Sequence, residues 1–187
     1  MAQKILLVAA AVAVAAGLVI GRALTISDPA PAASSDKESP CGEVGLPAHQ
    51  LGLERARALT FCLLNEQRAR EGLGPLRYDV RLELASQRHS EDMVGRGFFE
   101  HHTPEGVEPQ ARMLAVGYPA DNAFTGENIA RGQGVESSPV EIMDSWLRSP
   151  PHREAILNRS YAEVGVGVAT AGQAAMYTTD FGGPPLR

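Results

Sequence analysis

The amino-acid sequence predicts a single folded domain of the α+β class. Apolar residues recur at helical spacing in three segments, two β-rich runs close the chain, and helices precede strands instead of alternating with them. With 187 residues and 44% hydrophobic content, the chain is long enough to bury one core. We expect this domain over residues 48–187, behind a short N-terminal appendage.

Three helices are expected from apolar spacing and capping signals. Residues 50–71 carry leucine and alanine at intervals of three and four until GLGPL ends the pattern. Residues 80–96 repeat this spacing, and one face of that helix carries Leu82, Ala85, His89 and Met93. SPVE, which begins at Ser138, combines a capping box with proline at the first helical position. It therefore predicts a third helix, with Trp146 on its core face.

The two β-rich runs are VGVGVAT at residues 164–170 and AAMYTTDF at residues 174–181. The short sequence AGQ separates them, and a glycine-containing turn between two such runs is typical of a hairpin. We therefore expect the chain to end in two antiparallel strands.

The N-terminal segment carries an export signal. Lys4 precedes an uncharged run from Ile5 to Gly21, which is long for a signal-peptide core and barely long enough to span a bilayer. Residues 1–26 are therefore either a cleaved signal peptide or a retained membrane anchor. Residues 27–47 are rich in Pro, Ala and Ser, which predicts a flexible linker. The domain is expected outside the cell or anchored at its surface, with membrane contact only through an uncleaved N-terminal segment.

Cys41 and Cys62 are the only cysteines of the chain. Outside the cytoplasm they are expected to form a disulfide over a loop of about 20 residues, worth roughly 3 kcal/mol in the chain-entropy model. The alternative, Cys62 as a nucleophile, has little support because the residue lies among leucines on a predicted helix.

Composition and missing motifs exclude several partners and chemistries. The formal net charge of −5 leaves no basic field for nucleic acid, and no GxxxxGK[ST] loop supports a nucleotide. HExxH and GxSxG are also absent, so neither a zincin motif nor a nucleophile elbow is present. The sequence therefore gives no motif for nucleotide binding, for zincin-type proteolysis or for a serine nucleophile.

His89, Glu127 and His152 stand out as candidate site residues, although each also has an ordinary structural interpretation. His89 lies on an apolar helix face, where a hydrogen-bonded core histidine is common. Glu127, in GENIARG, would satisfy backbone N–H groups in a turn, and His152 would lie in an exposed first helical turn. Taken singly, none of the three indicates a site.

Seven motifs in a fixed order make the chain resemble the CAP superfamily, which includes cysteine-rich secretory proteins, venom antigens, pathogenesis-related proteins and bacterial relatives. The resemblance covers residues 59–182, and SPxHR with a later GVG is typical of the bacterial branch. The motifs are LLNEQRAREGLGPLRYD, LASQRHSEDM, FFEHHTPEG, RMLAVGYP, TGENIARG, SWLRSPPHREAILNRSYAEVGVG and YTTDFG. The resemblance implies an α-β-α sandwich with a small antiparallel sheet between helices.

The resemblance also implies a central cleft that gathers two histidines and two acids. It assigns the first histidine to His89, the GEN acid to Glu127 and the second histidine to His152, thirteen residues before Gly165. The fourth position departs from the animal pattern, because Ser149 stands where that pattern has an acid.

His101, in FFEHH, is a further candidate for the cleft, although it is equally well interpreted as a loop histidine. Two imidazoles and one carboxylate are a combination that holds Zn²⁺ with an open position for water. His89, Glu127 and His152 are therefore candidate metal ligands and zinc is the candidate cofactor. A hydrogen-bonded structural cluster is the alternative.

Two function classes follow from these residues. The first is a module that binds a divalent cation, a lipid or a peptide without catalysis, and the second is a metal-assisted hydrolase acting on peptides or cell-wall material. We favour the binding module, because the sequence lacks a nucleophile paired with a base.

Overall fold

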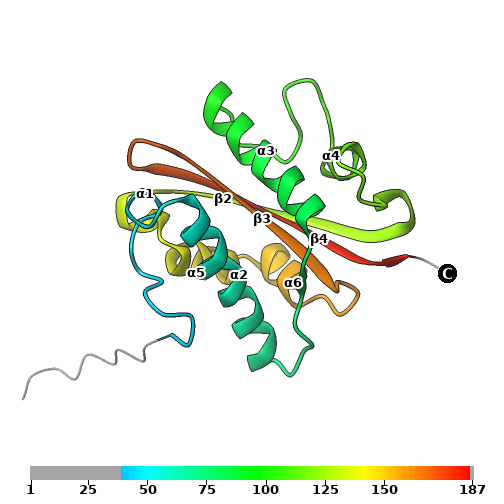
Figure 1. Cartoon of the computed structure of the whole chain (residues 1–187), viewed down its shortest axis with the longest axis horizontal. Coiled ribbons are helices and arrows are strands. Elements are labelled where there is room, and N and C mark those ends of the chain that lie inside the picture. The colour runs from blue at the N-terminus through cyan, green and yellow to red at the C-terminus, as the bar shows by residue number, and fades with distance from the viewer. Residues whose placement is uncertain (1–38, 186–187) are drawn as a thin grey trace, which may run out of the picture. The chain divides into compact units, whose positions relative to one another are not determined.

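The computed structural model describes residues 39–185 (Figure 1). The expected signal peptide or anchor, and the linker up to residue 38, lie outside the described residues. Within residues 39–185, no helix is long and apolar enough to cross a bilayer.

Six α-helices, two 3₁₀ turns and four strands make up the described part of the chain. The helices are α1 (Ala48–Leu51), α2 (Leu53–Arg70), α3 (Val80–Arg96), α4 (Pro109–Ala115), α5 (Pro139–Arg148) and α6 (Pro150–Leu157). The 3₁₀ turns are η1 (Ala120–Asn122) and η2 (Gly134–Ser137). The strands are β1 (Arg77–Tyr78), β2 (Ala123–Gln133), β3 (Glu163–Ala171) and β4 (Ala174–Pro185).

The four strands form one sheet in the order β1-β3-β4-β2. β3 and β4 form the expected antiparallel hairpin, β2 pairs antiparallel with β4, and the short β1 pairs parallel with β3. Among the described strands, β2 is therefore a long edge strand with one side free of strand partners.

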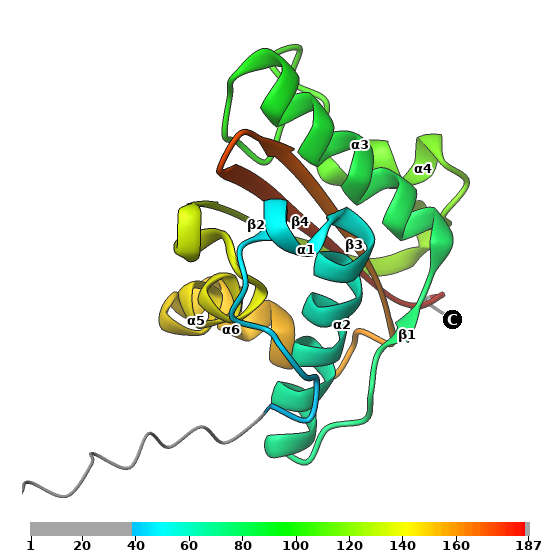
Figure 2. The ribbon, with the colours of Figure 1, turned by 60° about the vertical axis from the view of Figure 1, so that its left-hand side comes forward.

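Helices cover both faces of this sheet, which confirms the α-β-α sandwich. Figures 1 and 2 show α3 and α4 on one side and α2, α5 and α6 on the other. The larger core cluster joins α2, α5 and α6 to apolar side chains of the sheet, and the smaller one lies between α3, α4 and η1.

Two glycines of β3 explain the close approach of α3 to the sheet. A Cβ atom at Gly165 would lie 1.9 Å from the Glu83 backbone nitrogen, and one at Gly167 would lie 2.2 Å from the Ser86 carbonyl carbon. Any larger residue would push the helix away from the strand.

The predicted helices and hairpin are confirmed, with small shifts of their ends. The helix expected over 80–96 has those bounds, because the Asp79 side chain caps its first turn and Gly97 ends it in the left-handed region, with φ of 70°. β2 and α4 have weaker sequence signals and were not among the predicted elements, whereas α6 is the short helix considered for His152.

The segment expected to end the linker is part of the folded domain. Val44 is buried in the larger core cluster, and its carbonyl accepts a hydrogen bond from the Val140 backbone N–H at 3.1 Å. The folded domain therefore includes residues before residue 48 that were expected in the linker.

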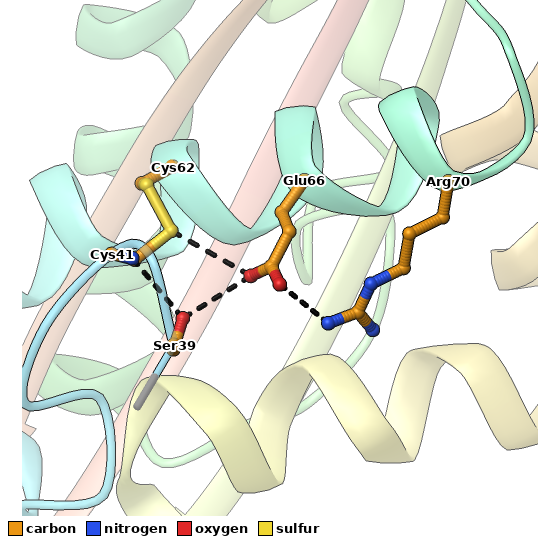
Figure 3. Close-up of a disulfide and its surroundings, with 5 residues drawn as sticks. All are labelled: Ser39, Cys41, Cys62, Glu66 and Arg70. Atoms are coloured by element: carbon orange, nitrogen blue, oxygen red, sulfur yellow. Dashed lines mark hydrogen bonds and ion pairs between the residues drawn. A yellow bond between two sulfur atoms is a disulfide. The ribbon is translucent and has the colours of Figure 1, made fainter. Parts of the chain in front are cut away.

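Cys41 and Cys62 are joined as expected, with their Cα atoms 5.7 Å apart. Figure 3 shows the bridge at the side of α2, where the Ser39 hydroxyl donates a hydrogen bond of 3.2 Å to Glu66. Arg70 binds the other oxygen of the same carboxylate. The disulfide thus fastens the start of the domain to the middle of α2.

Candidate functional site

The candidate site lies at the outer edge of β2. Successive side chains of this strand point to opposite faces of the sheet. Asn128 points toward α6, where its side-chain amide donates to the His152 carbonyl at 3.0 Å. Glu127 and Arg131 point to the opposite face, toward the loop that joins α3 to α4.

Two side chains hold the carboxylate of Glu127, which is only 2% exposed. The His101 Nδ1 atom lies 2.7 Å from Oε1, and the Arg112 guanidinium binds Oε2. His101 is 47% exposed and Arg112 is 10% exposed, so the histidine covers the outer side of the pair and the arginine lies deeper. The acid of the GEN motif therefore faces one arginine and one histidine.

Arg112 also fixes the loop that carries His101. Its guanidinium donates hydrogen bonds to the His101 carbonyl at 2.8 Å and to the Val107 carbonyl at 3.0 Å. The same side chain thus ties the loop to itself and to β2. Hydrogen bonding to Glu127 raises the pKa of His101, because the carboxylate stabilises the charged imidazole.

Asp180 on β4 lies directly opposite Glu127 in the strand register. It is fully buried, and the Ser86 hydroxyl donates to its Oδ2 atom at 3.0 Å. Its Oδ1 atom has no hydrogen-bond partner among residues 39–185. Burial, and then the charge of Glu127, raise the pKa of Asp180 well above its usual range, which favours the neutral acid.

His89 lies in the core, as its position on the apolar face of the helix predicted. It is 1% exposed, its Nε2 atom lies 2.9 Å from the Glu100 carbonyl, and its ring packs edge-to-face on Phe98. Burial lowers the pKa of His89. His89 therefore contacts the loop between α3 and α4 from within the core, through Phe98 and the Glu100 carbonyl.

His152 and His101 line one cavity of about 380 Å³. Its wall consists of loop residues Phe99, Glu100 and His101, edge residues Ile129, Ala130 and Arg131, and helix residues Ser145, Trp146 and His152. Burial and the nearby His101 lower the pKa of His152. The cavity therefore runs around the edge of β2, from the loop on one face of the sheet to α5 and α6 on the other.

The expected metal site of His89, Glu127 and His152 is not assembled. In the described part of the chain, no three His, Cys, Asp or Glu side chains are arranged to hold a metal ion. Glu127 is engaged by Arg112 and His101, and His89 Nε2 is engaged by the Glu100 carbonyl. Ser149, at the fourth position, is the N-cap residue of α6 and does not line the cavity. Among residues 39–185, His101 is the histidine that hydrogen-bonds Glu127, whereas the charge of Glu127 acts on His89 without a hydrogen bond.

Two residues of the site were not predicted from the sequence. Arg112 lies in RMLAVGYP and Asp180 in YTTDFG, so both belong to motifs already recognised. For Asp180 the signal was an acid inside an otherwise apolar and β-rich strand, which requires a buried polar partner. Arg112 had no comparable local signal.

Comparison with known proteins gives a consistent family and fold. Residues 61–181, more than half of the chain, match the family model described as "CAP: Cysteine-rich secretory protein family". The chain is 36% identical over 110 residues to the uncharacterized protein YkwD of Bacillus subtilis (strain 168), covering 59% of this chain and 41% of that protein. The uncharacterized membrane protein YlbC of the same organism is 36% identical over 106 residues, covering 57% and 29%. The chain therefore aligns with less than half the length of these relatives.

Two solved structures extend the comparison. An extracellular protein containing a SCP domain from Bacillus anthracis str. Ames superposes with a TM-score of 0.62 and 27% identity, covering 72% of this chain and 41% of that one. An outer surface protein from Borrelia burgdorferi superposes with a TM-score of 0.58 and 22% identity, covering 66% and 88%. At that identity the second likeness concerns the fold alone.

Proposed function

Because the chain belongs to the CAP family of cysteine-rich secretory proteins, we propose that its domain works outside the cytoplasm as a ligand-binding module without catalysis. The export signal at Ile5 to Gly21 and the Cys41–Cys62 disulfide support this location. The extracellular SCP-domain protein of Bacillus anthracis supports it by similarity. The binding site is the cavity at the edge of β2.

One observation carries the binding proposal: both carboxylate oxygens of Glu127 already have partners, while His101 and His152 line the cavity. Arg112 and His101 engage both oxygens of the carboxylate, so the acid is not a free general base. His101 instead lines the cavity while its Nδ1 atom is bound to Glu127, and its Nε2 atom has no hydrogen-bond partner among residues 39–185. This arrangement suits recognition of a ligand by fixed donors above an apolar floor.

The serine and threonine residues of the cavity lining also support binding without catalysis. Ser145 is the only serine or threonine among the described residues that line it, and no hydrogen bond joins Ser145 to His101 or His152. Covalent catalysis needs such a hydroxyl beside a base. The lining therefore offers contacts to a ligand and no activated nucleophile.

A metal-assisted hydrolase is the second candidate, and one observation favours it. His101 and His152 line the same cavity, and two imidazoles are common zinc ligands. A third ligand is required, and Glu127 becomes available only if Arg112 releases it. We rank this candidate second for that reason.

Saturation-transfer NMR on the exported protein tests the proposal, with short peptides, fatty acids and wall-derived sugars as probes. We expect at least one class to bind, and we expect His152→Leu to abolish the signal. Each bound probe is then incubated with the protein, with and without Zn²⁺, and followed by mass spectrometry. Unchanged probe supports the binding module, whereas Zn²⁺-dependent cleavage supports the hydrolase.

A further inference from the structure

We infer that the cavity at the edge of β2 binds a carboxylate carried on an apolar body, and not a divalent cation. This inference deepens the proposed function and rests on it. It follows from three features: where the charge of Glu127 is directed, which polar groups remain free in the cavity, and what forms the cavity floor.

The negative charge of Glu127 is directed away from the cavity and is compensated. The carboxylate is 2% exposed, lies behind His101 and is paired with the guanidinium of Arg112. A cation would reach Oε1 only by displacing His101, and it would reach Oε2 only by displacing the buried Arg112, which also holds two loop carbonyls. The site therefore offers a cation no accessible carboxylate from Glu127.

The free polar groups of the cavity are predominantly basic. Over residues 39–185, neither Nε2 of His101 nor the imidazole of His152 has a hydrogen-bond partner. Arg131 has no carboxylate within 4.0 Å in the same range, and its guanidinium lies over the Phe99 ring at 5.2 Å. Glu100 is the only acid among the described residues of the lining. Among the described residues of the lining, Arg131 thus supplies a cation without an ion-pair partner, and the two imidazoles supply ring nitrogens for hydrogen bonds, which together favour an anionic ligand.

The floor and walls of the cavity select what the anion is attached to. Phe99 is half-buried and contributes apolar surface beside the basic groups, and the nearly buried Ile129 and Trp146 lie beneath the lining. A carboxylate bonded to an aromatic or aliphatic body would place its charge at His101, His152 and Arg131 and its body on this surface. A C-terminal apolar residue of a peptide and a short fatty acid share this chemistry.

The test measures binding of N-acetylphenylalanine and of its amide to the oxidised, full-length protein by NMR titration. The two probes differ only in the charge of the terminal group. We expect the acid to bind about tenfold more tightly than the amide, because charge-assisted hydrogen bonds are about twice as strong as neutral ones. Decanoate is titrated in parallel, and the tighter of the two acids identifies a peptide terminus or a fatty acid as the source.

Two variants link the effect to the cavity. Arg131→Gln removes the uncompensated cation from the rim, and we expect it to reduce the preference for the acid to about threefold or less. Arg148→Gln is the matched control, because Arg148 is an exposed arginine of α5 outside this cavity. It should leave the preference unchanged.

The outcomes separate this inference from the proposed function. If acid and amide bound with equal affinity and both changed the NMR chemical shifts of His101 and His152, the inference of an anionic ligand would be wrong. The proposal of a binding module would still stand. Zn²⁺ bound by these two imidazoles, without any preference for the acid, would also overturn it. If no probe of any class bound in the cavity, both proposals would fall.

Discussion

Arg112 on α4 and Glu127 on β2 form a buried ion pair that fastens a loop to the edge of the sheet. The guanidinium binds Oε2 of the acid and two carbonyls of the loop, at His101 and Val107. One side chain therefore determines both the electrostatics of Glu127 and the position of His101. The pair is also the least dispensable polar contact of the site, because removing either partner leaves a buried charge.

Replacing Arg112 tests this role. Arg112→Met should lower the free energy of unfolding by about 3–5 kcal/mol, since it leaves the Glu127 carboxylate buried without its cation. Urea denaturation at neutral pH measures the change. The double variant Arg112→Met, Glu127→Gln should recover part of the loss, because it removes both charges. A single variant as stable as wild type would contradict the role of the pair.

The pKa of His101 should depend on Glu127. Hydrogen bonding to this carboxylate raises the imidazole pKa in the folded protein, so Glu127→Gln should lower it. The interaction therefore stabilises the folded protein fully below the pKa that His101 has in the unfolded state. This stabilisation is lost as pH rises through the pKa of His101 in the folded state. Imidazole NMR titration of both proteins measures the shift. Identical titration curves would show that the two side chains are not coupled in solution.

Asp180 should behave as a neutral acid. Its pKa is raised in the folded state, mainly by burial, so its contribution is present below the unfolded pKa and is lost as pH rises through the folded pKa. The groups near it are Ser86 on α3, Arg112 on α4 and Glu127 on β2. Asp180→Asn keeps the shape and should match wild type in stability at acidic pH, below the unfolded pKa of Asp180.

Denaturation across pH distinguishes a neutral from a charged Asp180. The variant should become progressively more stable than wild type as pH rises from the unfolded toward the folded pKa of Asp180, because only wild type must then bury a carboxylate or unfold to ionise it. Asp180→Leu is the contrasting substitution, since it leaves the Ser86 hydroxyl without its acceptor. If Asp180→Asn were destabilised equally at every pH, an ionised Asp180 would be required by the fold.

The fold was largely predictable because its main elements carry strong local signals. α3 has a regular apolar face, a capping aspartate and a terminal glycine, and the β3–β4 hairpin has two β-rich runs around a short turn. β2 was missed since its central sequence TGENIARG mixes glycine with polar residues. Such a composition is permitted in an edge strand, where half of the surroundings are solvent or loop.

The site was less predictable, because its contacts join segments far apart in the chain. The apolar spacing around His89 correctly indicated burial, yet burial alone does not tell which histidine meets Glu127. That choice depends on how the loop after α3 folds over β2, which Arg112 determines. Likewise, Asp180 and Glu127 become neighbours only through the register of β4 on β2. Local periodicity contains no information on either contact.

The disulfide provides a test of how the domain begins. The double variant Cys41→Ser, Cys62→Ser should lose about 3 kcal/mol of stability in the chain-entropy model. The segment around Val44 should also loosen, with faster amide exchange at Val140, whose N–H is bonded to the Val44 carbonyl. Hydrogen exchange measures this locally. The cavity at β2 lies elsewhere, so unchanged probe binding in the variant would separate stability from function.

Trp146 links the stability of the core to the edge of β2. Its ring is 1% exposed, and its indole N–H donates to the Ile129 carbonyl at 2.9 Å. The carbonyl belongs to the outer side of the edge strand, so the indole satisfies a group that no neighbouring strand can reach. The predicted inward orientation of Trp146 is thereby confirmed.

Two substitutions separate the ring from its hydrogen bond. Trp146→Ala should lower the free energy of unfolding by about 3–5 kcal/mol through loss of the buried ring. Trp146→Phe keeps most of the apolar volume and leaves the Ile129 carbonyl unpaired, which should cost about 1–3 kcal/mol. Denaturant unfolding measures both changes. Because the phenylalanine keeps an aromatic floor, N-acetylphenylalanine should bind this variant more tightly than it binds Arg131→Gln. The reverse order would show that the indole, and not the basic rim, dominates recognition in the cavity.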